Sequence, residues 1–298
     1  MATKLATLAF IYFARSRVGS LARHTPCWRL DCEPGSAHRA EPFRMKDWIS
    51  AFRLLALLVA ASLSNGCRRA VAPLIAPRQA AIALTGGSNT SMIYLARTTD
   101  GVLAIDLGWW GYGGALARAL DSLGATAADV RWVFLTHSHR DHIAAWPILR
   151  HARFYVGGPE RPLFVGATAH RGWIPRWTEH LKATRMPRPG ELELHTFAQD
   201  TVVVVGADTI RAFVVAGHTP GSVVYLFRGV LFLGDAVTYS RRGGFAPAKS
   251  GFSDNPRAGA ENLARLWARL PLDAVRYACT AHARCAPFTP DFLADVTQ

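Results

Sequence analysis

One stretch constrains this chain more than any other, because it joins a packed strand to a dense group of metal-binding side chains. Residues 130–135 are rich in β-branched and aromatic side chains and are bounded by polar residues, which predicts a buried strand. Residues 136–142 follow directly with the sequence THSHRDH, which holds four metal-capable side chains. The chain therefore places a polar, metal-capable loop at the carboxyl end of a packed strand.

The spacing of these side chains predicts two ions rather than one. In an extended backbone His137 and His139 lie on the same side, where both imidazoles reach one ion. Asp141 and His142 follow at the turn into a short helix that we expect over residues 143–149. Because two adjacent residues do not easily reach the point shared by the first pair, they suit a second ion nearby. The alternative is a chance cluster of polar surface residues, which so dense a motif disfavours.

The stretch resembles the HxHxDH signature of the metallo-β-lactamase superfamily, and four other segments resemble that family's further motifs in the family's order. Upstream, residues 104–108 (AIDLG) are similar to the aspartate motif that supports the metal site. Downstream, residues 217–222 (GHTPGS) are similar to the third-histidine motif. Residues 233–236 (LGDA) are similar to the bridging-aspartate motif, and residues 281–283 (AHA) to the final-histidine motif. The resemblance therefore covers most of the chain.

The resemblance implies a fold and a ligand set. The fold is an α/β (α+β) four-layer αββα sandwich with the metals at one edge, whereas periodicity alone predicts only a mixed α/β class. Seven ligands to two zinc ions are implied, three for the first ion, three for the second and one that bridges them: His137, His139 and His218; Asp141, His142 and His282; and Asp235. Imidazole and carboxylate ligands without thiolate suit zinc and also accept iron or manganese.

The implied reaction is hydrolysis. A hydroxide held between two zinc ions attacks an ester, lactone or thioester carbonyl, with Asp141 and Asp235 in catalytic positions. β-Lactamase and phosphodiesterase activity on the same fold are alternatives, although β-lactamases generally carry cysteine or serine where Asp235 stands. Another alternative is a mononuclear iron oxidoreductase of the persulfide dioxygenase kind. That enzyme needs only two histidines and an aspartate, so the full ligand set disfavours it.

Five further side chains are candidates for supporting roles near the metals. Asp106 is predicted to orient a ligand histidine or its loop, the alternative being an aspartate that caps a strand-end turn. Trp109, Trp110 and Tyr112 are candidates for an aromatic substrate wall, or else they pack on the adjacent helix. Tyr239 is a candidate hydrogen-bond donor to the oxyanion or leaving group, or else it packs its ring at the rim.

The charge and one long segment bear on the substrate. The formal net charge is +13, which favours anionic partners without choosing among nucleic acid, membrane surface and small molecule. Residues 157–200 include Arg171, Arg176 and Arg185, and a segment this long predicts a partly helical lid over an anionic or amphiphilic small molecule. A solvated basic face is the alternative. No basic and aromatic nucleic-acid-binding module stands out, so we expect no nucleic-acid partner.

The first part of the chain has the features of an export signal. Residues 1–44 lack sustained periodicity and predict a poorly structured extension, and Met45 is a second candidate start. Residues 45–66 combine a basic beginning with an apolar block, which is typical of a signal peptide and too short to span a membrane. The following Cys67 is similar to a lipobox cysteine, although Leu63 lies four residues before it rather than three. We therefore expect a bacterial periplasmic protein or a lipoprotein anchored through Cys67.

The remaining chain is expected to consist of a linker over residues 67–78 and one metallo-β-lactamase-fold domain over residues 79–298. Cys279 is predicted to be a buried thiol, and a disulfide with Cys285 is left open. Periodicity and turn residues predict strands over 79–84, 91–97, 102–105, 130–135, 154–156, 201–205, 209–215, 223–227, 230–233 and 274–279, and helices over 113–123, 143–149, 257–270 and 291–296.

Overall fold

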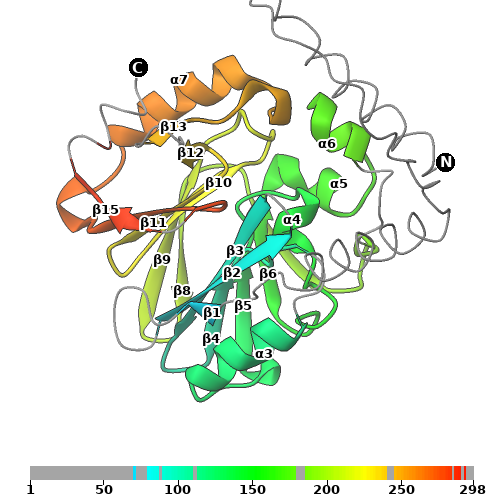
Figure 1. Ribbon diagram of the computed structural model, residues 1–298, viewed down its shortest axis with the longest axis vertical. Coiled ribbons are helices and arrows are strands. Elements are labelled where there is room, and N and C mark those ends of the chain that lie inside the picture. Colours follow the sequence, from blue (N-terminus) through cyan, green and yellow to red (C-terminus); the bar gives the residue numbers. More distant parts are fainter. Residues whose placement is uncertain are drawn as a thin grey trace, which may run out of the picture. The chain divides into compact units, whose positions relative to one another are not determined.

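Two mixed sheets form the centre of the structure (Figure 1). The computed structural model describes residues 70–71, 79–86, 89–109, 113–178, 185–239, 245–283, 285–289 and 292. The first sheet contains, in spatial order, β1 (Ala70–Val71), β2 (Gln79–Gly86), β3 (Asn89–Arg97), β4 (Val102–Ile105), β5 (Val130–Phe134), β6 (Arg153–Gly157) and β7 (Glu193–Phe197). The second contains β15 (Ala286–Pro287), β14 (Tyr277–Thr280), β11 (Val230–Gly234), β10 (Val223–Phe227), β9 (Asp208–Val214) and β8 (Thr201–Val205).

Helices and a small hairpin complete the described elements. The α-helices are α3 (Gly113–Ser122), α4 (Arg140–Ile143), α5 (Arg161–Phe164), α6 (Trp173–Thr178) and α7 (Pro256–Trp267). Short 3₁₀ turns lie at η1 (Ala127–Asp129), η2 (Gly158–Glu160), η3 (Ser250–Phe252) and η4 (Leu272–Ala274). Strands β12 (Val237–Tyr239) and β13 (Phe245–Pro247) form a separate antiparallel pair. No helix among the described residues is long and apolar enough to cross a membrane.

The strand period of two divides the apolar residues among three buried layers. In β3, Ile93 packs in the layer that includes α3, whereas Tyr94 packs between the two sheets. In β10, Tyr225 joins the layer between the sheets, whereas Val224 joins the layer that includes Leu263 of α7. Helices therefore cover the outer face of each sheet, and the predicted αββα sandwich is confirmed.

The strand that precedes the histidine motif is anchored between the sheets. Phe134 is fully buried, stacks on Tyr155 with ring centroids 4.7 Å apart, and meets Tyr225 edge-on at 5.4 Å. Burial of an aromatic side chain of this size contributes about 1.5–3 kcal/mol to folding. The Tyr225 hydroxyl donates to the Leu135 carbonyl at 2.9 Å, which links the second sheet to the end of β5. The loop after β5 therefore starts from a fixed position.

Strand direction brings the predicted motifs to one edge of the sandwich. Strands β4 and β5 are parallel, as are β11 and β14, so their carboxyl ends point the same way within each sheet. Strand β9 is antiparallel to β10 and therefore runs in the same direction as β11. The Val223 N–H donates across the two sheets to the Thr136 carbonyl at 2.8 Å, and the Met92 N–H donates to the Ala281 carbonyl at 2.9 Å. These bonds hold the loops of both sheets together.

The helix expected over residues 143–149 is wrong. The helix α4 instead covers Arg140–Ile143 and so includes two of the predicted ligands. It ends because the N–H groups of Ala144 and Ala145 donate to the carbonyls of Gly108 and Leu107 rather than continuing a helix. Pro147 also disfavours helical backbone at the residue before it. The backbone directly after the motif is therefore held by the loop after β4.

Other differences lie at the ends of the domain and in the long segment. The two-residue strand β1 lies within the stretch expected to be a linker and pairs with β2. Residues 157–200 contain η2, α5, α6 and β7. Strand β7 had no sequence prediction, because none of its residues is fully buried and most are polar. The predicted extension and signal peptide over residues 1–66 lie outside the described residues, as does Cys67. Of the helix predicted over residues 291–296, only Phe292 is described.

Candidate metal centre

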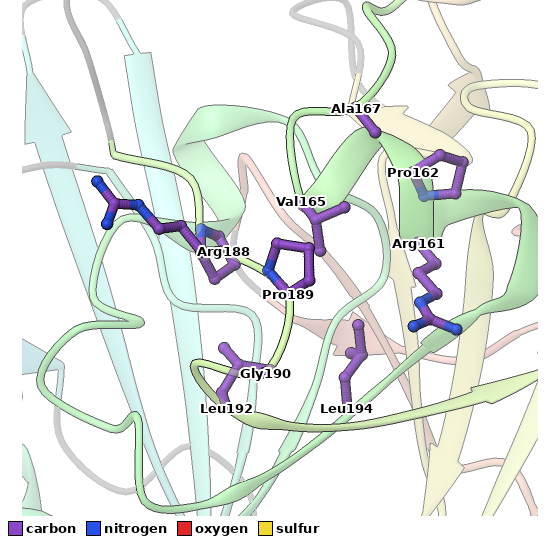
Figure 2. Close-up of a pocket in the computed structure, with 10 residues that line it drawn as sticks. Arg161, Pro162, Val165, Ala167, Arg188, Pro189, Gly190, Leu192 and Leu194 are labelled. Atoms are coloured by element: carbon purple, nitrogen blue, oxygen red, sulfur yellow. The ribbon is translucent and has the colours of Figure 1, made fainter.

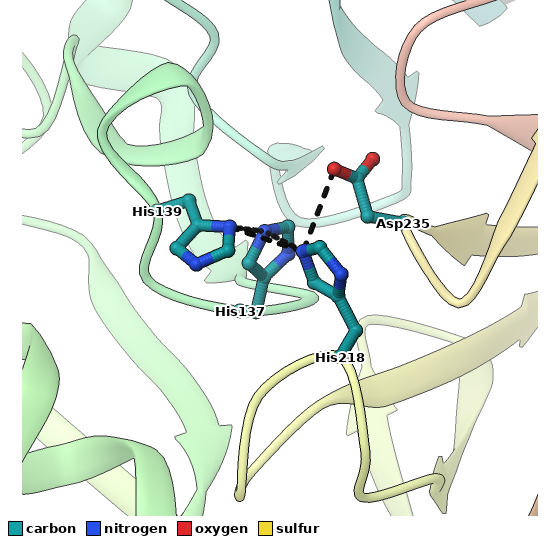
Figure 3. A group of neighbouring side chains, drawn as sticks. All are labelled: His137, His139, His218 and Asp235. Carbon is teal, nitrogen blue, oxygen red and sulfur yellow. Dashed lines mark hydrogen bonds and ion pairs between the residues drawn. The ribbon is translucent and has the colours of Figure 1, made fainter. Parts of the chain in front are cut away.

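Three buried imidazoles and one carboxylate converge after β5, β9 and β11 (Figure 3). The Nε2 atom of His137 lies 3.0 Å from Nδ1 of His139. The Nε2 atom of His218 lies 3.2 Å from that of His137 and 3.0 Å from Nδ1 of His139. Oδ2 of Asp235 lies 3.5 Å from Nε2 of His218. Ligand nitrogens about 2.0–2.1 Å from a tetrahedral ion lie roughly 3.3 Å from one another, so this donor set fits a metal ion.

A second group lies beside the first and shares Asp235. Asp141, His142 and His282 offer one ligand atom each within 4.8 Å of one another. Nε2 of His282 lies 3.0 Å from Oδ2 of Asp235 and 3.4 Å from Oδ2 of Asp141. Nε2 of His142 is buried without a hydrogen-bond partner and lies 3.7 Å from Oδ2 of Asp235. Because one oxygen of Asp235 faces both groups, this carboxylate occupies a bridging position.

Asp106 fixes the rings of two of these histidines. Its carboxylate accepts hydrogen bonds from the Thr136 backbone N–H at 2.8 Å and from the Thr136 hydroxyl at 2.8 Å. Since that hydroxyl donates its proton to Asp106, it accepts from Nδ1–H of His137 at 3.1 Å. Nδ1–H of His142 donates directly to Asp106 at 2.9 Å. Both histidines consequently direct Nε2 toward the two donor groups.

The backbone at Asp106 is unusual and is held by its neighbours. Asp106 has a φ of 56°, a left-handed conformation that a non-glycine residue seldom adopts. Its N–H donates to the Phe134 carbonyl at 3.0 Å, and the next N–H, of Leu107, donates to the His142 carbonyl at 2.6 Å. The conformation turns the carboxylate back toward the metal groups. Asp106 therefore bonds both to the predicted ligand His142 and to the backbone of the loop that carries it.

His218 is oriented by a different hydroxyl. Its Nδ1 atom lies 3.2 Å from the Ser253 hydroxyl, which donates its own proton to the Lys249 carbonyl at 2.9 Å. The hydroxyl therefore accepts from Nδ1–H of His218, so Nε2 faces His137 and His139. Asp254 also contacts this loop, because its N–H donates to the His218 carbonyl at 2.9 Å. No motif in the sequence marked Ser253 for this role.

The histidines of the two donor groups differ in pKa, because burial and neighbouring charges act on them differently. Burial and the neighbouring imidazoles hold the pKa values of His137 and His139 well below their usual range, and burial lowers the pKa of His218 to about 4. Burial alone would also lower the pKa of His282. The carboxylates of Asp235 and Asp141 outweigh that effect and raise the pKa of His282 to about 9. The first group therefore offers neutral imidazoles at pH 7, whereas the second holds a proton that a metal ion must displace.

The loop that carries His282 is closed by a disulfide between Cys279 and Cys285. Cys279 is fully buried, as expected, but the expectation that it is a free thiol is wrong. The two cysteines lie at the end of β14 and just before β15, which pair with each other, so their Cα atoms lie only 4.0 Å apart. The disulfide shortens the connection on which His282 lies and so restricts the positions of its imidazole.

The expected aromatic wall is only partly described. Trp109 is half-buried, packs against the core layer that includes α3, and has the Arg140 guanidinium 5.9 Å from its ring. This packing agrees with the alternative in which the ring lies against the adjacent helix, and the role of Trp109 in substrate binding stays a prediction. Trp110 and Tyr112 lie outside the described residues. The backbone of Tyr239 ends β12, but its side chain also lies outside the described part of the chain.

Two residues near the donor groups had no predicted role in the sequence. The buried ring of His170 lies edge-on to His139, with centroids 4.4 Å apart, and brings the long segment against the first group. Glu160 is fully buried between the loops that carry His139 and His218. Neither lies in a recognisable motif, so only the folded chain shows where they are.

A cavity of about 480 Å³ lies in the long segment, apart from the seven predicted ligands (Figure 2). Residues 161–167 and 187–194 contribute its lining, which is mostly proline, leucine and other apolar side chains. Arg161 and Arg188 add two guanidinium groups. The cavity is not part of either metal group, because none of the seven predicted ligands lines it.

The fold and donor sets define a metal-binding α/β enzyme, and comparison with known proteins gives its family. The sequence pattern of the Metallo-beta-lactamase superfamily matches residues 86–282. The chain therefore belongs to the metallo-beta-lactamase superfamily, as its motifs predicted, and it is classed with the metal-dependent hydrolases.

Relatives of known name match only part of their length. The chain is 31% identical over 111 residues to hydroxyacylglutathione hydrolase of Acidiphilium cryptum (strain JF-5), covering 37% of this chain and 36% of the relative. It is 34% identical over 120 residues to hydroxyacylglutathione hydrolase of Synechococcus sp. (strain JA-3-3Ab), covering 40% and 39%. The aligned region thus spans well under half of each relative.

Solved structures share the fold. A metallo-beta-lactamase of Novosphingobium pentaromativorans superposes with a TM-score of 0.52 at 19% identity, over 74% of this chain and 82% of that one. A metallo-beta-lactamase family protein of Thermus thermophilus gives a TM-score of 0.51 at 23% identity, over 75% and 77%. At these identities the comparison supports the architecture alone.

Asp106→Asn will weaken metal binding to the group that contains His142. The amide replaces one of the two oxygens that accept from Thr136 and His142, so one donor loses its acceptor. We expect zinc affinity to fall about 10- to 100-fold, as for other groups that orient a ligand histidine. Competition with a chromophoric chelator measures this. The exposed Asp121→Asn is the control, and equal affinities in both variants would contradict the role of Asp106.

Zinc binding to the two groups will respond differently to pH. Below pH 9, an ion that binds beside His282 displaces a proton from a group whose pKa is about 9, whereas His218 holds no proton above its pKa of about 4. We expect the affinity of the second group to fall at least about tenfold for each pH unit below 9, because the raised pKa of His142 adds a second proton that zinc must displace. The first group retains its ion down to about pH 5. Equilibrium dialysis followed by elemental analysis measures both, and simultaneous loss of the two ions would contradict the assignment.

Proposed function

We propose that the chain is a dinuclear zinc hydrolase that cleaves an ester, lactone or thioester. The observation that carries the proposal is the position of Asp235, whose Oδ2 atom faces His218 of one group and His282 of the other. Both donor groups consist of imidazole and carboxylate without thiolate, which suits zinc. A persulfide dioxygenase-like iron enzyme needs one group only, so the second complete group disfavours that alternative.

Two zinc ions would supply a water nucleophile activated near neutral pH and would polarise the substrate carbonyl oxygen. The residues of the chain do the rest. His137 and His218 present lone pairs from fixed rings, because the hydroxyls of Thr136 and Ser253 hold their opposite ring nitrogens, and Asp106 holds His142 in the same way. We assign to the Asp141 carboxylate, which is only partly buried, the role of accepting the proton released by the attacking water. Transfer of that proton to the leaving oxygen or sulfur completes hydrolysis.

The named relatives favour an acyl substrate. Both are hydroxyacylglutathione hydrolases, whose names denote hydrolysis of an acyl compound. We propose an anionic or amphiphilic acyl substrate, supported by the basic long segment. Asp254 ties that segment to the His218 loop, because its carboxylate accepts from the N–H groups of Arg171 and Gly172 at 2.8 and 2.6 Å. The exposed Arg171 side chain therefore extends from backbone that is anchored beside the metal groups.

We also propose that the mature protein acts outside the cytoplasm, in the periplasm or attached to a membrane through Cys67. The disulfide between Cys279 and Cys285 supports this, since such bonds persist mainly in oxidising compartments. Fractionation of cells that produce the full chain tests the proposal. Recovery of the protein in the periplasmic or membrane fraction is expected, and recovery only in the cytosol would contradict it.

The metal content tests the proposed function directly. Elemental mass spectrometry of the purified chain should find about two zinc ions per chain, as in a two-metal site. Asp235→Ala removes the shared carboxylate, so zinc content and turnover of ester, lactone and thioester substrates should both fall, turnover by at least about 100-fold. The exposed Asp273→Ala should retain both. A single iron per chain, with oxygen-dependent turnover of persulfides, would instead support the oxidoreductase alternative.

Kinetics of arginine variants test the substrate proposal. Arg171 and Arg176 are exposed on the long segment, whereas Arg185 is already paired with Glu191 and packs over Trp146. Replacing Arg171 and Arg176 by alanine should raise KM for anionic substrates about 3- to 10-fold with little change in kcat, because it removes binding without touching the chemistry. The exposed Arg257→Ala on α7 is the control. Unchanged KM values for every anionic substrate would exclude this contact.

A further inference from the structure

Glu160 joins the two loops that carry the first metal group. Its side chain is fully buried and lies at the end of η2, directly after β6. Oε1 accepts from the backbone N–H and from the hydroxyl of Ser138, both at 2.6 Å. Oε2 accepts from the Thr219 hydroxyl at 2.7 Å and from the Gly221 N–H at 3.1 Å. One oxygen therefore serves the loop after β5, and the other serves the loop after β9.

The donors of Glu160 lie next to predicted metal ligands. Ser138 stands between His137 and His139, and Thr219 directly follows His218. A carboxylate has four principal acceptor positions, and four donors from two separate loops occupy them here. The distance between the two oxygens of one carboxyl group is fixed by covalent geometry. Glu160 thus relates the two loops through a single rigid group.

Close backbone packing fixes the place of Glu160 itself. A Cβ atom added to Gly157 would lie 2.2 Å from the carbonyl oxygen of Gly221. A Cβ atom added to Gly221 would lie 2.4 Å from the backbone nitrogen of Glu160. Only glycine permits this approach at either position, so the turn after β6 rests directly on the His218 loop. The carboxylate cannot shift without moving one of the histidine loops.

We propose that Glu160 is a positioning residue that sets the separation of the His137–His139 loop and the His218 loop for the first metal ion. The inference rests on the metal centre of the proposed function and adds a residue that no ligand motif contains. The hydrogen bonds of Glu160 go to Ser138, Thr219 and Gly221 rather than to a predicted ligand side chain, so it acts through these residues. Its effect should therefore appear in metal affinity and loop dynamics even where no substrate is turned over.

Two substitutions at Glu160 test separately its acceptor oxygens and the length of its side chain. Glu160→Gln keeps the shape but replaces one acceptor oxygen by an NH₂ group. Whichever oxygen is replaced, a backbone N–H loses its acceptor, either that of Ser138 or that of Gly221. Glu160→Asp keeps both oxygens but is one methylene shorter, so it cannot reach both loops. The exposed Glu193→Gln on β7 is the matched control. Thr219→Val is a milder variant that removes a single hydroxyl donor and leaves Glu160 in place.

The experiment measures zinc affinity by chelator competition and amide hydrogen exchange of the metal-free full chain. We expect Glu160→Gln and Glu160→Asp to lower the affinity for the more tightly bound zinc about 10- to 100-fold. We expect faster exchange at Ser138 and Gly221, with the exchange of β10 unchanged. Thr219→Val should show a smaller loss in the same direction, and it keeps the test decisive if either Glu160 variant fails to fold. Glu193→Gln should match the unmodified chain.

The inference is overturned if folded Glu160→Gln or Thr219→Val binds zinc as tightly as the unmodified chain. It is also overturned if exchange rises equally in β10 and in the two loops, because Glu160 would then support only global stability. Failure of the proposed function looks different. An unmodified chain that binds zinc but hydrolyses no ester, lactone or thioester would contradict the reaction, while the affinity and exchange measurements would still decide the role of Glu160.

Discussion

The convergence of three buried imidazole lone pairs is the constraint on which the rest of the site depends. Nε2 of His137, Nδ1 of His139 and Nε2 of His218 lie within 3.2 Å of one another, and neighbouring groups bond to the far nitrogens of His137 and His218. The hydroxyl partners of His137 and His218 leave a lone pair on each Nε2, and these two atoms lie 3.2 Å apart, so they repel each other unless a cation lies between them. Burial prevents protonation from relieving the repulsion, since it lowers the pKa values of these groups. A metal ion satisfies all three nitrogens at once.

The surrounding polar groups can be understood as the supports of this arrangement. Asp106 orients His137 through Thr136 and orients His142 directly. Ser253 orients His218, and Glu160 connects the loops behind the three histidines. Each support is a buried oxygen with hydrogen-bond partners in the backbone, hydroxyl groups or an imidazole, and these bonds reduce the free-energy cost of burying it. The sandwich supplies these supports because its strand ends from both sheets meet at one edge.

The sequence predicted what depends on periodicity and on contiguous motifs. Strand β4 was predicted with its observed ends, and the β-branched and aromatic run of residues 130–135 correctly predicted a packed strand before the histidines. The helix after the motif was misplaced, because the N–H groups of Ala144 and Ala145 bond to a loop more than thirty residues earlier, a contact that no local pattern shows. The disulfide was left open for the same reason. Its formation depends on the pairing of β14 with β15.

The supporting residues beyond Asp106 were not predictable from local sequence. Glu160 lies 22 residues after Ser138 and 59 before Thr219, and its neighbours form an ordinary Gly-Pro turn. His170 lies in the long segment without a spacing that relates it to His139, yet the fold brings the two rings into edge-on contact. Such residues act through contacts made by tertiary structure, so they become visible only once both sheets and their loops are in place.

X-ray absorption at the zinc edge of the zinc-loaded chain tests the central claim most directly, because it reports the atoms around the ion without requiring a substrate. The account predicts nitrogen and oxygen neighbours at about 2.0–2.1 Å, no sulfur neighbour, and a second zinc at about 3.5–4 Å. A sulfur neighbour near 2.3 Å, or the absence of any metal neighbour in a chain that carries two zinc ions, would contradict it.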